Sequence, residues 1–450
     1  MKAVDTILHG RWVLPVNDTD ELLHDHSVVI DDGRISAILP TSEARQNFSA
    51  SIEKTYADHL LMPGLINAHT HSSMNLFRGM SDDLGLDEWL NHHIWPAEAK
   101  WVGEQFVHDG SQLAMAEMLR SGTTCFNDMY FFPDVTARLS RDIGMRACIG
   151  LIAIDFPSAW ASNANDYIDK GLQLRDHFRS DSLIHTPFAP HAPYTVSDEP
   201  LGRIRMLADE MDLPVHIHLH ETAFEVEQSL KQYGMRPLQR LNELGLVSPN
   251  LVAVHFTQAS DQDIALMAES GSHVVHCPES NLKLASGFCP VKKLMDAGIN
   301  VALGTDGVAS NNDLSMIGEM HSASLLAKAV SQDPTALNAM QTVRMATING
   351  ARALGLEQDT GSLQPGKFAD IIAVDFSALE MQPVYDPVAN LVYSGNRQQI
   401  SDVWVAGRHL LKDRQLTTLD EAALLRKCQQ WNDKIRSHAE NAQPKADLQL

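Results

Sequence analysis

The sequence predicts an α/β protein: a (β/α)8 barrel of the TIM type with a small β-sandwich domain built from both ends of the chain. Apolar segments alternate with helical segments between residues 61 and 355, which is the order of elements in such a barrel. Strand-like segments without helices occupy residues 1–60 and 360–420. Histidines and acidic residues follow the apolar segments, and the chemistry of these barrels lies at the carboxyl ends of their strands.

The small domain is predicted from short apolar stretches bounded by Gly, Pro, Asn and Asp. These expected strands cover residues 3–8, 12–15, 27–31, 34–39, 369–375 and 403–411. We expect the two sets to pair into one composite domain. Residues 421–450 are expected to form a C-terminal helix and tail, with a loose tail over 441–450.

The barrel is predicted from eight strand–helix units in fewer than 300 residues. The expected strands cover residues 64–68, 123–128, 147–153, 183–189, 215–219, 251–255, 273–276 and 300–304. The expected helices cover residues 104–121, 135–143, 166–178, 199–211, 237–244, 261–269, 291–297 and 338–354. A doubly wound sheet is the alternative, but the regular alternation and the length favour the barrel.

Charge and cysteine content limit the classes of function. The formal net charge of -22 disfavours binding to nucleic acid or to an anionic membrane and leaves a small-molecule partner. The five cysteines form no Cys-x-x-Cys pair, which favours reduced thiols in a cytoplasmic protein. No apolar run has the length of a signal peptide core or a membrane span.

A His-x-His motif ends the first barrel strand. Side chains alternate along a strand, so His69 and His71 point to the same face and suit one shared metal ion. Other polar residues stand at later strand ends. These are Asn127, Asp128, His191, His216, His218, His220, Glu221, His255, His276 and Asp306.

Three imidazoles and one carboxylate suit a catalytic Zn²⁺ or Fe²⁺. His69, His71, one histidine of the fifth strand and Asp306 supply this set. Alternation leaves His216, His218 and His220 open, because all three share a face. We favour His218, since it places Glu221 three residues further on, beside the expected metal.

Several motifs resemble the amidohydrolase superfamily over residues 3–415. Within it, the chain is most similar to the 5'-methylthioadenosine/S-adenosylhomocysteine deaminases, with guanine deaminases and triazine hydrolases as close relatives. The motifs are Pro-Gly-Leu-Ile-Asn-Ala-His-Thr-His at 63–71, His-Leu-His-Glu at 218–221, Val-His at 254–255, His-Cys-Pro-Glu-Ser-Asn-Leu at 276–282, Gly-Thr-Asp-Gly at 304–307 and Gly-Ser-Leu-Gln-Pro-Gly-Lys-Phe-Ala-Asp at 361–370.

The resemblance implies hydrolytic deamination of an adenine ring at C6. It makes Glu221, His255 and Asp306 the catalytic residues, and Glu98, His191 and Glu221 the substrate contacts. It implies one divalent metal per subunit on His69, His71, His218 and Asp306, with Zn²⁺ expected and Fe²⁺ as the alternative. No lysine stands near the end of the fourth strand, as a two-metal site would need. A homo-oligomer, dimer or tetramer, is also expected.

One departure concerns the tail of the substrate. Relatives that accept S-adenosylhomocysteine carry arginines between strands 3 and 4, and residues 154–169 contain none. The apolar Phe156 and Trp160 suit a methylthio group, so 5'-methylthioadenosine is expected to be preferred. A guanine, 8-oxoguanine or triazine hydrolase and a non-catalytic scaffold are the alternatives. The roles of His92, His93, His276 and Asn281 stay open.

Overall fold

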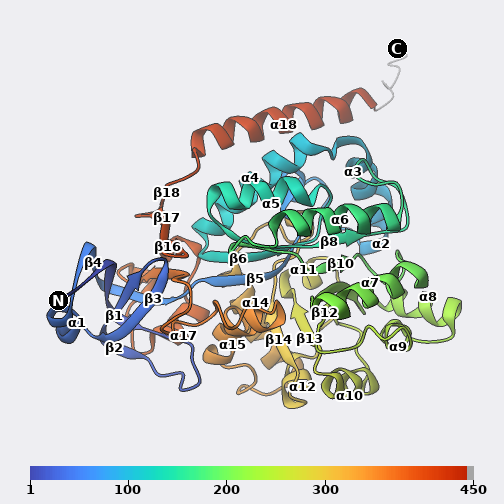
Figure 1. The fold of residues 1–450 in the computed structure, drawn as a ribbon. Coiled ribbons are helices and arrows are strands. Elements are labelled where there is room, and N and C mark those ends of the chain that lie inside the picture. Colours follow the sequence, from blue (N-terminus) through green and yellow to red (C-terminus); the bar gives the residue numbers. More distant parts are fainter. Residues whose placement is uncertain (443–450) are drawn as a thin grey trace, which may run out of the picture.

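The computed structural model describes residues 1–442 and places a barrel beside a large curled sheet (Figure 1). The predicted loose tail at 441–450 falls outside these residues from 443 onward. The N-terminal segment and the segment before the C-terminal helix both enter the sheet, and that helix, α18 (Glu421–Ala442), runs across one side of the molecule (Figure 1). No helix within residues 1–442 combines the length and the apolar character needed to cross a bilayer.

The terminal segments form one eight-stranded sheet in the order β18-β17-β16-β15-β4-β1-β2-β3. The edge strand β3 meets the segment before β15, where Ile35 N donates a hydrogen bond to Lys367 O. The sheet therefore curls around its own apolar core. The strands are β1 (Lys2–Val13), β2 (Leu23–Asp31), β3 (Arg34–Pro40), β4 (Phe48–Pro63), β15 (Ile371–Asp375), β16 (Ile400–Val405), β17 (Arg408–Lys412) and β18 (Gln415–Leu416). Short helices accompany it: α1 (Thr41–Asn47), η3 (Leu379–Met381), α17 (Pro387–Tyr393) and η4 (Arg397–Gln399).

Two features of this sheet differ from the sequence prediction. The expected strands at 3–8 and 12–15 are one strand, β1, with a bulge between Gly10 and Trp12. The 16-residue strand β4 was missed, although it pairs with both β1 and β15. Its first half is mostly exposed and polar, so no apolar alternation marks it before Leu60.

The barrel strands agree closely with the prediction. They are β5 (Leu65–Thr70), β6 (Thr123–Asp128), β7 (Arg146–Ile149), β8 (Leu151–Ala153), β9 (Ile184–His185), β10 (Phe188–Pro190), β11 (Val215–Leu219), β12 (Leu251–His255), β13 (His273–His276) and β14 (Asn300–Leu303). The expected third and fourth strands are each interrupted. β7 pairs with β9 and β8 with β10, so the two broken strands join the halves of the barrel.

The seam between the first and last strands matters for the site. Asp306 N donates to His69 O at 3.0 Å, and Thr305 N donates to Asn67 Oδ1 at 3.0 Å. Asn67 Nδ2 donates in return to Thr305 Oγ1 at 2.7 Å. A buried side chain therefore completes the closure and brings His69 beside Asp306.

Helices surround the barrel and cover its mouth. The outer helices are α4 (Glu104–Arg120), α5 (Pro133–Ile143), α6 (Ala164–Phe178), α7 (Asp198–Met211), α8 (Ala223–Tyr233), α9 (Pro237–Glu243), α10 (Asp261–Ser270), α11 (Pro278–Lys283), α12 (Val291–Asp296), α13 (Val308–Asn311), α14 (Met316–Ser331), α15 (Ala339–Met345) and α16 (Ile348–Ala353). Four short elements follow β5 on the way to α4: η1 (Ser72–Phe77), α2 (Leu86–Glu88), η2 (Trp89–Ile94) and α3 (Trp95–Trp101).

The 16-residue helix α14 was absent from the prediction. It buries the polar Glu319 and Ser324, while Leu325 is 46% and Val330 48% exposed. Because polar residues lie on the buried side of the helix and apolar residues on its exposed side, the sequence does not show a clear helical period of apolar residues.

A buried ion pair connects the barrel to the sheet. Arg146, on β7, donates from Nε to Asp370 Oδ2 at 2.7 Å and from Nη2 to Asp370 Oδ1 at 3.2 Å. Both side chains are 1% exposed. Asp370 also accepts from Ala406 N and from Thr360 Oγ1, so its carboxylate is held on several sides.

Replacing Asp370 with alanine should lower the free energy of unfolding by about 3–5 kcal/mol, because it leaves a buried guanidinium unpaired. Denaturant unfolding monitored by circular dichroism measures this change. The control is Asp58→Ala, which removes an exposed pair with Arg11 and should cost less than about 1 kcal/mol. Equal losses for the two variants would contradict the assigned role of the buried pair.

Candidate metal and substrate site

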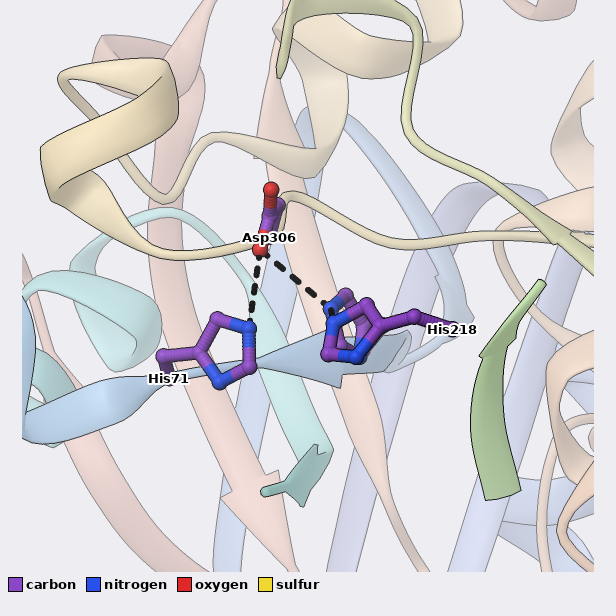
Figure 2. Close-up of side chains that lie close together, drawn as sticks. His71, His218 and Asp306 are labelled. Atoms are coloured by element: carbon purple, nitrogen blue, oxygen red, sulfur yellow. Dashed lines mark hydrogen bonds and ion pairs between the residues drawn. The ribbon is translucent and has the colours of Figure 1, made fainter. Parts of the chain in front are cut away.

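Four side chains converge at the carboxyl end of the barrel. His69, His71, His218 and Asp306 each offer one ligand atom, and these atoms all lie within 4.8 Å of one another. Asp306 Oδ1 lies 3.2 Å from Nε2 of both His69 and His71. Figure 2 shows His71 and Asp306 pointing toward one another, with the ring of His218 beside them.

The hydrogen bonds behind the rings decide which nitrogens face the centre. His71 Nδ1 donates to Met129 O at 2.6 Å, and His218 Nδ1 donates to His191 O at 2.7 Å. The neutral form of each ring therefore leaves an Nε2 lone pair directed inward. His69 Nε2 lies 3.2 Å from His218 Nε2, and His69 Nδ1 is paired with His216 Nε2 at 3.0 Å.

This arrangement fits a bound cation. Inward lone pairs and a carboxylate oxygen at these separations repel one another unless positive charge lies between them. Three imidazole nitrogens and one carboxylate oxygen are the donors that a catalytic zinc site uses. The residues present therefore fit a single divalent transition metal ion.

Asp306 is held as an anion in a constrained backbone conformation. Its φ of 64° lies in the left-handed region, which directs the carboxylate toward the histidines. Oδ2 accepts from Ser280 Oγ at 2.6 Å and from Ser310 Oγ at 2.8 Å. Burial alone would raise the pKa of Asp306, but the rings of His69 and His71 beside its carboxylate hold that pKa well below its usual range.

The structure distinguishes the three histidines of β11. His216 lies behind His69 and supports its ring. His220 turns away, since its Nε2 accepts from Leu238 N at 3.1 Å and its ring stacks on Phe256. His218 alone of the three joins the cluster, as the sequence analysis favoured.

Glu221 and His255 stand next to the cluster. Glu221 Oε2 lies 3.8 Å from His255 Nε2, and both side chains are buried. Burial raises the pKa of Glu221 above its usual range. His255 Nδ1 pairs with Asn281 Oδ1 at 2.9 Å, so Asn281 orients the ring of His255. This contact gives Asn281 a place that the sequence left open.

A cavity opens over these residues and includes the two remaining predicted contacts. Together with its open mouth it contains about 670 Å³ of empty space. His191 and Glu98 line it together with apolar side chains. Glu98, on α3, accepts a hydrogen bond from Tyr130 Oη at 2.6 Å. Burial raises the pKa of Glu98 to about 7 and lowers that of His191 to about 3.

Three further histidines of open role lie off the cavity wall. His92 and His93 lie on η2, outside the residues that line the cavity, while their neighbours Leu90 and Ile94 line it. His276, at the end of β13, is buried and also lies outside the residues that line the cavity. Tyr130 was missed, although its position two residues after a predicted barrel strand could have identified it.

A (β/α)8 barrel with this donor set at the carboxyl ends of its strands defines a metal-dependent hydrolase. The model of the amidohydrolase family matches residues 60–410. The chain belongs to the amidohydrolase family.

The most similar proteins cover nearly all of the chain. It is 52% identical over 433 residues to a 5-methylthioadenosine/S-adenosylhomocysteine deaminase of Teredinibacter turnerae, covering 96% of this chain and 98% of that protein. A deaminase of the same name from Saccharophagus degradans is 53% identical over 433 residues, covering 96% and 97%. The crystal structure of an adenosine deaminase from Xanthomonas campestris with bound zinc superposes with a TM-score of 0.96 at 52% identity, covering 97% of this chain and 99% of that one.

Removing one histidine of β11 should remove the metal, while removing its neighbour should not. We expect His218→Ala to lose most of its zinc, because an inward nitrogen is gone, and His220→Ala to keep about one ion per chain. Inductively coupled plasma mass spectrometry of the dialysed proteins measures this. Equal metal content in the two variants would contradict the ligand assignment.

Proposed function

We propose that the protein is a hydrolytic deaminase of purine nucleosides that converts 5'-methylthioadenosine to 5'-methylthioinosine and ammonia. The observation that carries this proposal is one cavity that contains both the metal ligands with Glu221 and, on a separate element, the carboxylate of Glu98. The first group suits attack at a ring carbon, and the second suits binding of a diol. The relatives named above support the same class of reaction.

The chemistry replaces the amine at C6 with an oxygen from water. His69, His71, His218 and Asp306 would hold a divalent metal, which we propose is zinc, and the metal would lower the pKa of a water molecule and so supply the nucleophile. Burial raises the pKa of Glu221, so this carboxyl group keeps its proton to a higher pH than an exposed one. It can therefore deliver a proton to ring N1. This proton makes C6 a better electrophile.

The other residues orient groups and move protons. Asp306, kept ionised by its neighbours, accepts a proton from the attacking water. His255, oriented by Asn281, aligns the oxygen that adds to C6. A second proton, passed by Glu221 or Asp306, leaves with the amine as ammonia. Water and the aminopurine are thus converted to the oxopurine and ammonia without any other reactant.

The sugar is placed by Glu98, in our proposal. A carboxylate accepts two hydrogen bonds from neighbouring hydroxyls, and Tyr130 occupies one side of Oε1, which leaves the rest of the group for the ribose diol. His191 is neutral at pH 7 because burial lowers its pKa to about 3, so it is suited to a hydrogen bond with the uncharged purine.

The tail at the 5' carbon should be short and apolar. A pocket next to Glu98 is walled by Phe131, Phe132, Ile154 and Phe156. No lysine or arginine within residues 1–442 lines this pocket or the main cavity. The carboxylate of S-adenosylhomocysteine would therefore lack a cation there, whereas a methylthio group would meet apolar walls.

The alternative ring substrates lack the feature that Glu98 recognises. Guanine, 8-oxoguanine and triazines carry no ribose, so they offer no diol to the Glu98 carboxylate, which would keep only its hydrogen bond from Tyr130. For the cellular setting we propose the cytoplasm, in keeping with five cysteines that form no disulfide, and a homodimer or homotetramer. Sedimentation velocity measures the latter.

A panel of substrates tests the proposed reaction. Ammonia release should be fastest with 5'-methylthioadenosine, slower with adenosine and S-adenosylhomocysteine, and absent with guanine, because only the first matches both the diol and the apolar pocket. The measurement is kcat/KM for each substrate with the zinc-loaded protein. A preference for S-adenosylhomocysteine would contradict the tail assignment, and turnover of guanine alone would contradict the proposed function.

Glu98→Ala should raise KM for nucleosides about 10- to 100-fold, because charge-assisted hydrogen bonds to the ribose are lost, and should change kcat less. The wild-type KM should also rise as pH falls through about 7, since protonation removes the carboxylate, and this dependence should vanish in the variant. Glu104→Ala, an exposed change at the start of α4, is the control. A variant KM within twofold of wild type would contradict ribose binding by Glu98.

A further inference from the structure

We propose that Glu225 is a positioning residue that holds Glu221 in place for proton transfer. The inference rests on the proposed function, because the role of Glu221 is part of that proposal. Glu225 lies in the first turn of α8, directly after the loop that carries Glu221, and its side chain is 5% exposed.

Both oxygens of the Glu225 carboxylate bind the backbone of that loop. Oε1 accepts from His220 N at 3.0 Å, and Oε2 accepts from Glu221 N at 2.7 Å. Two consecutive amides are thus held by one side chain. The residue is not needed as a helix cap, since Thr222 Oγ1 already accepts from Glu225 N at 3.3 Å.

The loop needs such a support because it turns sharply at the end of β11. His220 has a φ of 55°, in the left-handed region that residues other than glycine rarely adopt. Thr257 Oγ1 donates to Glu221 O at 2.6 Å, so the backbone of Glu221 is bound at both its N–H and its C=O. The Glu221 side chain faces the cavity and His255, and its position therefore depends on these backbone contacts.

The burial of Glu225 argues for a specific role. An ionisable group without a partner is costly inside a protein, and among the side chains described, those of residues 1–437, no lysine, arginine or histidine forms an ion pair with Glu225. Its partners are the amides of the two residues that link β11 to Glu221. Glutamine has one acceptor oxygen, so it can satisfy only one of these amides.

Glu225→Gln should lower kcat for 5'-methylthioadenosine about 10- to 100-fold, since small displacements of a catalytic group have effects of this size. KM should stay within twofold of wild type and the zinc content should be unchanged, because Glu98 and the metal ligands are untouched. Glu225→Asp keeps both acceptor oxygens on a shorter side chain, so its kcat should lie between those of wild type and Glu225→Gln. If Glu225→Gln does not fold, Glu225→Asp is the test variant. Glu227→Gln, an exposed change on the same helix, is the matched control.

The double variant separates positioning from general damage. If Glu225 acts through Glu221, adding Glu225→Gln to Glu221→Gln should leave the residual rate unchanged. An equal loss in both backgrounds, or a kcat equal to wild type in Glu225→Gln, would overturn the inference. Full activity of Glu221→Gln itself would instead contradict the proposed function, so the two failures are distinguishable.

Discussion

Electrostatic repulsion at the end of the barrel is the constraint on which the site depends. Lone pairs of His71 and His218 and the carboxylate of Asp306 face one space within 4.8 Å, which is unfavourable without a cation. The surrounding structure holds them there nonetheless. Met129 O and His191 O fix two rings, and the seam between β5 and β14 fixes the third beside Asp306. The fold is thus prepared for a metal before one binds.

The substrate half of the site comes from different elements. The short helices after β5 carry Glu98 to the cavity, and Tyr130 after β6, which also lines the cavity, donates a hydrogen bond to it. The metal half comes from β5, β11 and the end of β14. This separation explains how one barrel end can serve many ring hydrolases: the metal ligands stay on strands, while recognition lies in the loops and short helices.

The sequence predicted much of this for a physical reason. Strands such as β11 to β13 are buried on both faces, so they appear in the sequence as short apolar runs. The sequence analysis therefore predicted the bounds of these strands correctly and identified the histidines at their carboxyl ends. β4 and α14 were missed because their exposed and buried residues do not separate into apolar and polar faces. His218 could be favoured over His216 and His220 only by its spacing to Glu221. Tyr130 could have been found from its position just after β6, but the role of Glu225 depends on contacts between elements, which periodicity does not reveal.

The most direct test of this account is an anomalous difference map at the zinc edge from crystals of the zinc-loaded protein with bound 5'-methylthioinosine. We predict one strong peak at about 2.0–2.2 Å from the ligand atoms of His69, His71, His218 and Asp306. The ribose hydroxyls of the product should contact Glu98, and its ring N1 should contact Glu221. A peak at another site, or a product bound with its ribose away from Glu98, would contradict the account.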